Sequence, residues 1–298
     1  MKLGKIGVWA MLDKLSSAET AALAKSLDDW GYSALWQAEG FGRDVMVESS
    51  WLIAHSSKLI AASGIANIYA RDAVCTKGAQ LALAEQAPGR FLLGLGVSHG
   101  MVVEWRGHSY QKPIEAMRAY LTAMREWSYQ APAPAENPPT VIAALGPRML
   151  ELAASHADGA HPYNVTPEHT AQARAIMGPD KLLCVEQKVI LSTDPARARA
   201  TAQQVMAHYL QLPNYVSNWR RLGFGDEDFT TPYSNRLLDA MVAWGDEDAV
   251  LERVRQHLDA GADHVCIQAI SPSGDSLIDQ DALGRIARRA AEKALLSS

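Results

Sequence analysis

Short apolar runs alternate along the chain with longer stretches in which apolar residues recur at helical spacing. The short runs are hydrophobic on both faces, which is typical of strands in a parallel sheet covered by helices. The pattern therefore predicts eight buried strands with helices between them. We place the strands at residues 5–9, 34–36, 59–66, 89–97, 141–144, 159–162, 183–191 and 264–268.

The helices between these strands begin and end at recognisable signals. Ser16 and Glu19 have the spacing of a capping box, which satisfies free amides at a helix start, and Gly31 is placed to end that helix. Pro113 opens another helix, whose apolar positions form one stripe from Met117 to Trp127. Eight strands alternating with helices predict an α/β fold, a (β/α)8 TIM barrel with residues 1–298 in a single domain.

One connection departs from the regular alternation. About seventy residues separate the seventh and eighth strands, whereas a βα loop ordinarily has roughly 2 to 6. We therefore expect a helical insertion from about residue 194 to 245, with Asp194 capping its first helix. Aromatic residues such as Tyr215, Trp219 and Phe224 suggest that it forms a lid.

The composition narrows the class of protein. The 298 residues are 48% hydrophobic and 20% charged, which is ordinary for a globular protein with a large core. A net charge of −5 offers no basic face, so we expect no nucleic-acid partner. Without a run of ~18 apolar residues or a secretory leader, we also expect no membrane association. Three distant cysteines do not suggest disulfides, which favours a cytoplasmic protein.

The carboxyl ends of the strands build the active site of a TIM barrel, so these positions indicate the chemistry. They contain no HExxH pair for zinc, so we expect no metal, and no two facing carboxylates for a glycosidase. Lys188 lies inside a strand, which makes Schiff-base chemistry a weak candidate. The remaining positions suit a large planar cofactor with its own reactivity. They are Trp9, Glu39, Ser63, Gly64, Ser98, His99, Ala144, Leu145, Gly146 and His161.

Two further features bear on a ligand. Gly94, Gly96 and Gly100 do not match a dinucleotide fingerprint, because His99 stands where its third glycine belongs. These glycines either let a flat ligand approach the backbone or relieve crowding inside the barrel. Arg148 lies in the first turn of the helix after Gly146, where its charge opposes the helix dipole and indicates a nearby anion.

Three segments, residues 62–72, 90–99 and 260–265, resemble the luciferase-like monooxygenase superfamily, and more narrowly its coenzyme F420 (deazaflavin)-dependent oxidoreductase branch. The resemblance runs from the first strand to the eighth. It implies a barrel with an enlarged connection before the last strand. It also implies F420 as the cofactor, with FMN as the alternative.

The resemblance further implies roles for single residues. Ser63 and Gly64 fall where relatives have a non-proline cis peptide behind the cofactor ring. We therefore expect a cis or bulged peptide there, or one residue later at Ile65, with the Ser63 hydroxyl able to donate to the ring. Segments that line the cofactor's phosphate and side chain contain Val97, Ser98, Ala144, Leu145 and Gly146.

Glu39 and His99 are the candidates for proton transfer. The resemblance places Glu39 where the branch often has an acid near the cofactor, and His99 where some relatives carry a catalytic glutamate. Gly40 replaces a catalytic histidine of some relatives, which departs from their scheme. The residues alone leave Glu39 open as a solvated loop acid and His99 as a ring bonded within its loop. They also leave His161 open as an inward donor or a packing residue.

The leading hypothesis is an oxidoreductase that transfers a hydride between F420 and a small organic substrate. One alternative is an FMN-dependent monooxygenase that uses O2, and another is a non-catalytic flavin-binding protein. We also expect a homodimer, because the helices after the second and third strands carry more apolar residues than one barrel face needs. These residues are Val45, Met46, Trp51, Leu52 and Ile53.

Overall fold

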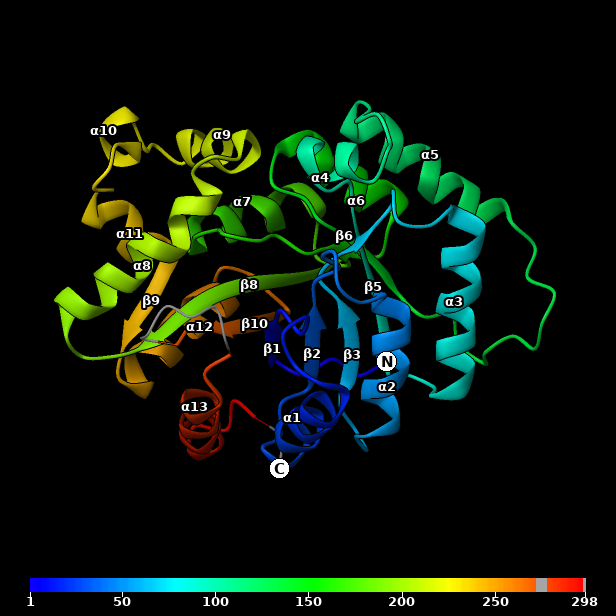
Figure 1. The fold of residues 1–298 in the computed structure, drawn as a ribbon, viewed down its shortest axis with the longest axis horizontal. Coiled ribbons are helices and arrows are strands. Elements are labelled where there is room, and N and C mark those ends of the chain that lie inside the picture. Colours follow the sequence, from blue (N-terminus) through cyan, green and yellow to red (C-terminus); the bar gives the residue numbers. More distant parts are fainter. Residues whose placement is uncertain (272–277, 297–298) are drawn as a thin grey trace.

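The computed structural model describes residues 1–271 and 278–296, and its strands form a closed parallel barrel surrounded by helices (Figure 1). The last barrel strand pairs in parallel with both the first strand and β8, which closes the wall and confirms the predicted (β/α)8 fold. The strands are β1 (Ile6–Ala10), β2 (Ala34–Gln37), β3 (Ile60–Ser63), β4 (Ala66–Asn67), β5 (Phe91–Gly96), β6 (Thr140–Ile142), β7 (Gly159–Ala160), β8 (Leu182–Leu191), β9 (Val242–Gly245) and β10 (His264–Ala269).

The third barrel strand is interrupted. Its two pieces, β3 and β4, both pair in parallel with β5, through Ala61 and Ala62 in β3 and through Ala66 and Asn67 in β4. Residues 64 and 65 lie between the pieces, at the carboxyl end of the barrel wall. The apolar pattern predicted one strand over 59–66, and the bulge expected within it at Ser63 and Gly64, or one residue later, divides that strand into two pieces.

The helices follow the predicted alternation. Ser16 and Glu19 form the expected capping box, with the Glu19 carboxylate accepting from the Ser16 amide at 2.7 Å, and Gly31 has a φ of 83° at the predicted helix end. The helices are α1 (Ser17–Asp29), α2 (Val45–Ala54), α3 (Ala73–Gln86), α4 (Gly100–Trp105), α5 (Pro113–Glu126), α6 (Pro147–His156), α7 (Pro167–Met177), α8 (Pro195–Tyr209), α9 (Pro213–Arg221), α10 (Asp226–Phe229), α11 (Asn235–Met241), α12 (Glu247–Asp259) and α13 (Gln280–Glu292). Among the described residues, no helix has the length and apolar character needed to cross a membrane.

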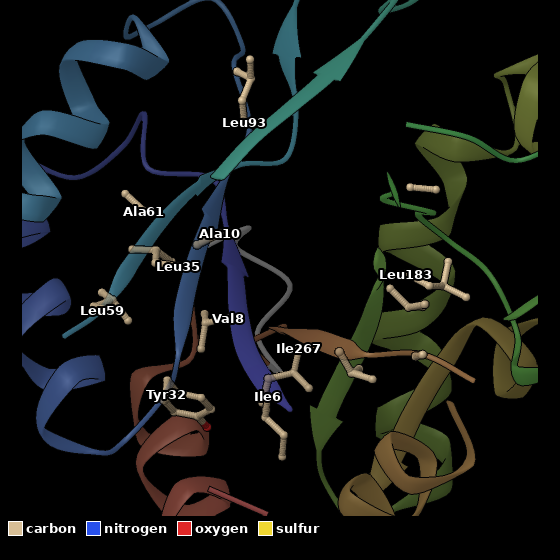
Figure 2. Close-up of a cluster of buried hydrophobic side chains, with 14 of the residues drawn as sticks. Ile6, Val8, Ala10, Tyr32, Leu35, Leu59, Ala61, Leu93, Leu183 and Ile267 are labelled. Atoms are coloured by element: carbon tan, nitrogen blue, oxygen red, sulfur yellow. The ribbon is translucent and has the colours of Figure 1, made fainter. Parts of the chain in front are cut away.

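Alternate residues of each strand face two separate apolar layers. Figure 2 shows part of the outer layer, where Val8, Leu35 and Ala61 from neighbouring strands are buried with residues of the surrounding helices. The intervening positions, such as Trp9 and Trp36, fill the barrel interior. Each fully buried large side chain contributes about 1.5 to 3 kcal/mol, so the two layers together dominate the stability of the barrel.

The insertion between β8 and β10 contains helices α8 to α11, as expected, and Asp194 caps α8 by accepting from the amides of Ala196 and Arg197. It has its own apolar cluster, which includes Met206, Trp219 and Leu237. The insertion also contains β9, which pairs in parallel with the end of β8 and was not predicted. Its four residues form an apolar run that is too short to be identified as a strand from the sequence.

Most of the residues predicted to form a dimer surface are buried in this chain, so that surface assignment is wrong in part. Val45, Met46, Leu52 and Ile53 are each at most 9% exposed and belong to the core of this chain, because α2 packs them against the barrel. Trp51 is the one member of the predicted set that is exposed, at 38%. The homodimer therefore stays a prediction without the surface first assigned to it.

Candidate active site

A non-proline cis peptide joins Gly64 to Ile65 in the break between β3 and β4, at the second of the two predicted positions. Trp9 Nε1 donates to the carbonyl oxygen of Gly64 at 2.9 Å. The Ser63 hydroxyl donates to the Gly94 carbonyl oxygen and accepts from the Gly94 amide, both at 2.9 Å. Ser63 therefore ties the bulge to β5, and its expected hydrogen bond to a cofactor ring is wrong because the hydroxyl proton is already used.

The glycines of β5 make room for this bulge. A Cβ atom on Gly94 would lie 2.0 Å from the backbone oxygen of Ser63, and one on Gly96 would lie 2.4 Å from the Ile65 side chain. A Cβ on Gly64 would lie 2.9 Å from Trp9 Nε1 and 3.0 Å from His161 Nε2. Gly94 and Gly96 thus make room for the Ser63 backbone and the Ile65 side chain, which agrees with the alternative that these glycines relieve crowding inside the barrel.

Glu39 lies in a buried ion pair. Its Oε2 accepts from the Asn67 amide at 2.8 Å and from Arg71 Nη1 at 2.9 Å, while its Oε1 accepts from Arg71 Nη2. Arg71 also bonds Asp44 at 2.7 Å, and the Glu39 side chain is only 3% exposed. Both carboxylate oxygens are engaged, so this arrangement favours a structural role over the predicted catalytic one.

His99 stands at the mouth of the barrel, directly before α4, with its side chain free of any capping bond. Its ring lies 5.9 Å from that of Tyr215 in α9, so the insertion reaches the end of β5 (Figure 1). Burial lowers the pKa of His99, and charge on His208 lowers it further. The imidazole is therefore neutral at neutral pH and able to accept a proton. Ser98, beside it, adopts a left-handed backbone with a φ of 58°.

Tyr163 of the barrel and two tyrosines of the insertion, Tyr209 and Tyr215, form a group of aromatic rings at the mouth. The ring of Tyr163, after β7, lies 5.0 Å from Trp9 and 5.6 Å from Tyr209 in α8. The Tyr163 hydroxyl bonds the Tyr209 hydroxyl at 2.7 Å and donates to Gln268 Oε1 at 2.8 Å. Tyr215 meets Tyr209 edge-on at 5.4 Å. These contacts place α8 and α9 over the barrel, as expected of a lid.

His161 points into the barrel beneath the bulge and also packs there, so both sequence-based interpretations hold in part. Its Nδ1 lies 2.8 Å from the Cys184 carbonyl oxygen, so this nitrogen carries the proton. Its ring stacks on Trp36 at 4.4 Å, and Trp36 Nε1 donates to His264 Nε2 at 3.0 Å. Burial lowers the pKa of both histidines to about 4, so the barrel interior holds two neutral imidazoles.

Lys188 is fully buried in the same interior. Its ammonium lies 3.2 Å from Glu186 and 3.8 Å from the centroid of the Tyr163 ring. Burial lowers the pKa of Lys188 to about 8 and raises that of Glu186. The amine is covered by Tyr163, in keeping with the weak case for Schiff-base chemistry.

The loop from Ala144 to Gly146 presents free backbone donors. Within the described part of the chain, the amides of Leu145 and Gly146 have no hydrogen-bond acceptor. Gly146 is the N-cap of α6 and has no side chain to satisfy that helix end. Arg148 is exposed on the first turn of α6, as its predicted position implies. Free amides at a helix N-terminus are suited to an anion.

The sequence profile of the family described as luciferase-like monooxygenase matches residues 3–264. The chain belongs to this family. A Mycobacterium tuberculosis protein assigned as a coenzyme F420-dependent oxidoreductase is 26% identical over 75% of this chain and 78% of its own length. The F420-dependent tetrahydromethanopterin reductase from Methanopyrus kandleri has a similar fold, with a TM-score of 0.75, 17% identity, and 98% and 99% of the two chains covered. So does a type II Baeyer–Villiger monooxygenase from Pseudomonas putida in complex with FMN, with a TM-score of 0.71, 12% identity, and 97% and 98% coverage.

Several mouth residues of this luciferase-like enzyme were missed in the sequence. Tyr163 follows the short β7, and Tyr209, Asn218 and Arg221 belong to the insertion, where no strand end marks a position as functional. The signal available was the aromatic and basic character of residues 209–224. That signal indicated a lid but could not show which of its side chains turn toward the barrel.

Proposed function

We propose that this luciferase-like enzyme transfers a hydride between coenzyme F420 and a small organic substrate at the mouth of the barrel. The observation that carries the proposal is the break between β3 and β4, which stands at the carboxyl end of the barrel wall and is held by hydrogen bonds of Trp9 and Ser63. TIM barrels conduct their chemistry at this end. The F420-dependent assignment of the Mycobacterium tuberculosis relative supports F420 over FMN.

The residues present fit a flat cofactor with an anionic side chain. Small residues and Ile65 offer an apolar seat for a ring, and the free amides at Leu145 and Gly146 suit its phosphate. Val97 and Ser98 follow β5, which lies between β3 and β6 in the sheet, in keeping with a role along the cofactor side chain. When bound, the deazaflavin supplies a carbon centre that carries a hydride, and the protein supplies position and protons.

His99 is the best candidate to handle the proton. Hydride transfer between the cofactor and a carbonyl or alcohol must be matched by a proton on the substrate oxygen. The imidazole of His99 is neutral, lies at the mouth and has no capping bond, so one of its nitrogens can exchange that proton. Tyr215 packs beside it and limits access of water to the reacting groups.

An FMN-dependent monooxygenase is the second candidate. The aromatic cover from α8 and α9 favours it, because oxygen chemistry on a flavin requires that water be excluded. The Pseudomonas putida structure contains FMN in the same fold. A flavin-binding protein without catalysis is the third candidate, because Glu39 is engaged with Arg71 and leaves His99 as the main acid-base group at the mouth.

Titration of the apoprotein with F420 and with FMN, followed by ring fluorescence, separates these functions. We expect F420 to bind at least about tenfold more tightly than FMN, and the bound F420 to be reduced by a member of a panel of primary and secondary alcohols. Tight binding of FMN with none of F420 would reverse the order of the first two candidates. Binding of F420 without turnover across a broad substrate panel would favour the non-catalytic one.

A further inference from the structure

The inner face of α9 carries polar atoms that the fold leaves without partners. Asn218 is 1% exposed, and its Nδ2 has no hydrogen-bond acceptor among the described residues. Asn164, also 1% exposed, lacks partners for both Nδ2 and Oδ1, and its backbone oxygen accepts from Trp219 Nε1 of α9 at 3.0 Å. A buried amide without a partner is costly, so three such atoms beside one helix point to a ligand.

Arg221 connects this face to the loop before α6. Its Nη2 donates to Asn218 Oδ1 at 3.1 Å, and a Cβ atom placed on Gly146 would lie 3.3 Å from the same nitrogen. The guanidinium therefore reaches across from the insertion to the N-cap of α6. Within the described part of the chain, no carboxylate pairs with Arg221, whereas its neighbour Arg220 forms an ion pair with Asp226.

The charges at this place have one sign. The N-terminus of α6 carries a partial positive charge, Arg148 lies in its first turn, and Arg221 approaches its N-cap. The charge of Arg221 also contributes to the lowered pKa of His169, although burial is the larger cause, and His169 Nε2 lies 2.8 Å from the Leu145 carbonyl oxygen. Arg148 and Arg221 are both exposed at this place, and together with the helix N-terminus they would stabilise an anion bound among them.

We infer that Arg221 and Asn218 of α9, together with the amides of Leu145 and Gly146, bind the phosphate ester of the cofactor. The inference rests on the proposed function and adds to it, because two of the donors belong to the insertion rather than to the barrel. The phosphate joins the lid to the barrel, with the Asn218 amide and the Arg221 guanidinium on one side and backbone donors on the other. A planar guanidinium suits a phosphate because it can donate two parallel hydrogen bonds.

The test compares cofactors with and without their phosphate. Affinities are measured for F420 and for its phosphate-free deazaflavin ring, and for FMN and riboflavin, with the wild type, Arg221→Gln and Arg220→Gln. We expect Arg221→Gln to weaken binding of the phosphorylated cofactor about tenfold or more, and to leave the affinity for the phosphate-free ring unchanged. Arg220→Gln is the matched control on the same helix and should change neither affinity. Equal weakening of both forms by Arg221→Gln, or no weakening, overturns the inference.

A second measurement keeps this inference separate from the proposed function. Inorganic phosphate is added to the apoprotein and the melting temperature is followed. We expect phosphate to raise the melting temperature of the wild type and of Arg220→Gln, but not that of Arg221→Gln. If the wild type binds neither F420 nor FMN, the proposed function fails, and this phosphate effect alone decides the anion site. Absence of the effect in the wild type in that case overturns the inference.

Discussion

Trp9 Nε1 donates a hydrogen bond to the carbonyl oxygen of Gly64, 2.9 Å away. The bond joins β1 to the break in the third barrel strand, although 55 residues separate the two in sequence. Trp9 is 4% exposed, so the carbonyl oxygen has no ready access to water as an alternative donor. The position of the bulge at the barrel mouth therefore depends on this indole.

Trp9→Phe removes the donor and keeps an aromatic ring in the barrel. We expect a loss of about 1 to 3 kcal/mol in the free energy of unfolding, because a buried carbonyl oxygen is left without a partner. Cofactor affinity should fall as well, since the bulge loses its support. Urea denaturation and cofactor titration measure the two effects. Trp105→Phe, at a residue that is 70% exposed, serves as the control, and equal effects of the two variants would contradict the prediction.

Gly94→Ala should destabilise the apoprotein by about 3 kcal/mol or more. The added methyl group would lie 2.0 Å from the Ser63 backbone oxygen, and backbone cannot move aside as a flexible side chain can. Gly78→Ala in α3 is the control, because its methyl group would meet nothing closer than Trp127 at 3.8 Å. We expect Gly78→Ala to be neutral or to stabilise by about 0.5 to 1 kcal/mol. Thermal unfolding of the two variants measures both changes in stability. A loss of stability in Gly94→Ala no larger than in Gly78→Ala would show that the bulge can relax.

Glu39→Gln distinguishes a structural from a catalytic role. The substitution leaves the buried guanidinium of Arg71 with Asp44 as its remaining carboxylate partner, so we expect a loss of about 2 kcal/mol in stability. If the role is structural, kcat measured on folded enzyme should change less than about threefold. A kcat loss of a hundredfold or more with an unchanged melting temperature would instead support the catalytic role first assigned to Glu39.

His99→Gln should lower kcat by roughly a hundredfold or more and leave F420 affinity nearly unchanged, because a general acid-base group contributes about that much. The neutral form of His99 is the one able to accept a proton. Since burial lowers the pKa of His99, the fall in wild-type activity with decreasing pH should be centred below the ordinary pKa of histidine. The variant should lose that acid limb of the pH profile. An unchanged profile would exclude His99 as the proton partner.

Buried histidines should make the protein less stable in mild acid. Burial lowers the pKa of His161 and His264 to about 4 and that of His257 to about 3. Between pH ~6.5 and 4 the unfolded chain binds protons that the folded chain does not, so stability decreases as the pH falls through this window. Each histidine contributes at most about 1.4 kcal/mol per pH unit. Urea denaturation from pH 7 to 4 measures the slope, and His264→Gln should reduce it. An equal slope in the variant would show that His264 takes up its proton normally.

The candidate site was only partly accessible from the sequence. The bulge at Gly64 and Ile65 and the loop at 144–146 were located through resemblance to a family, and the structure places both at the barrel mouth. Glu39 and the Ser63 hydroxyl were given roles toward a cofactor, but each has a protein partner: Arg71, 32 residues away, and Gly94, 31 residues away. No local pattern reports such partners.

The sequence by itself determined the barrel, because strand and helix periods, the Ser16 capping box and the two-sided apolar strands are local signals that a parallel sheet must obey. It also determined that a lid interrupts the barrel, since the length of the connection is visible in the chain. Only the tertiary structure decided which side chains of that lid meet the barrel. Arg221 reaches Gly146 across 75 positions of sequence, and Tyr215 reaches His99, because the packing of α9 sets their directions. Side-chain direction over such separations depends on how whole elements pack, and that information exists only once the chain has folded.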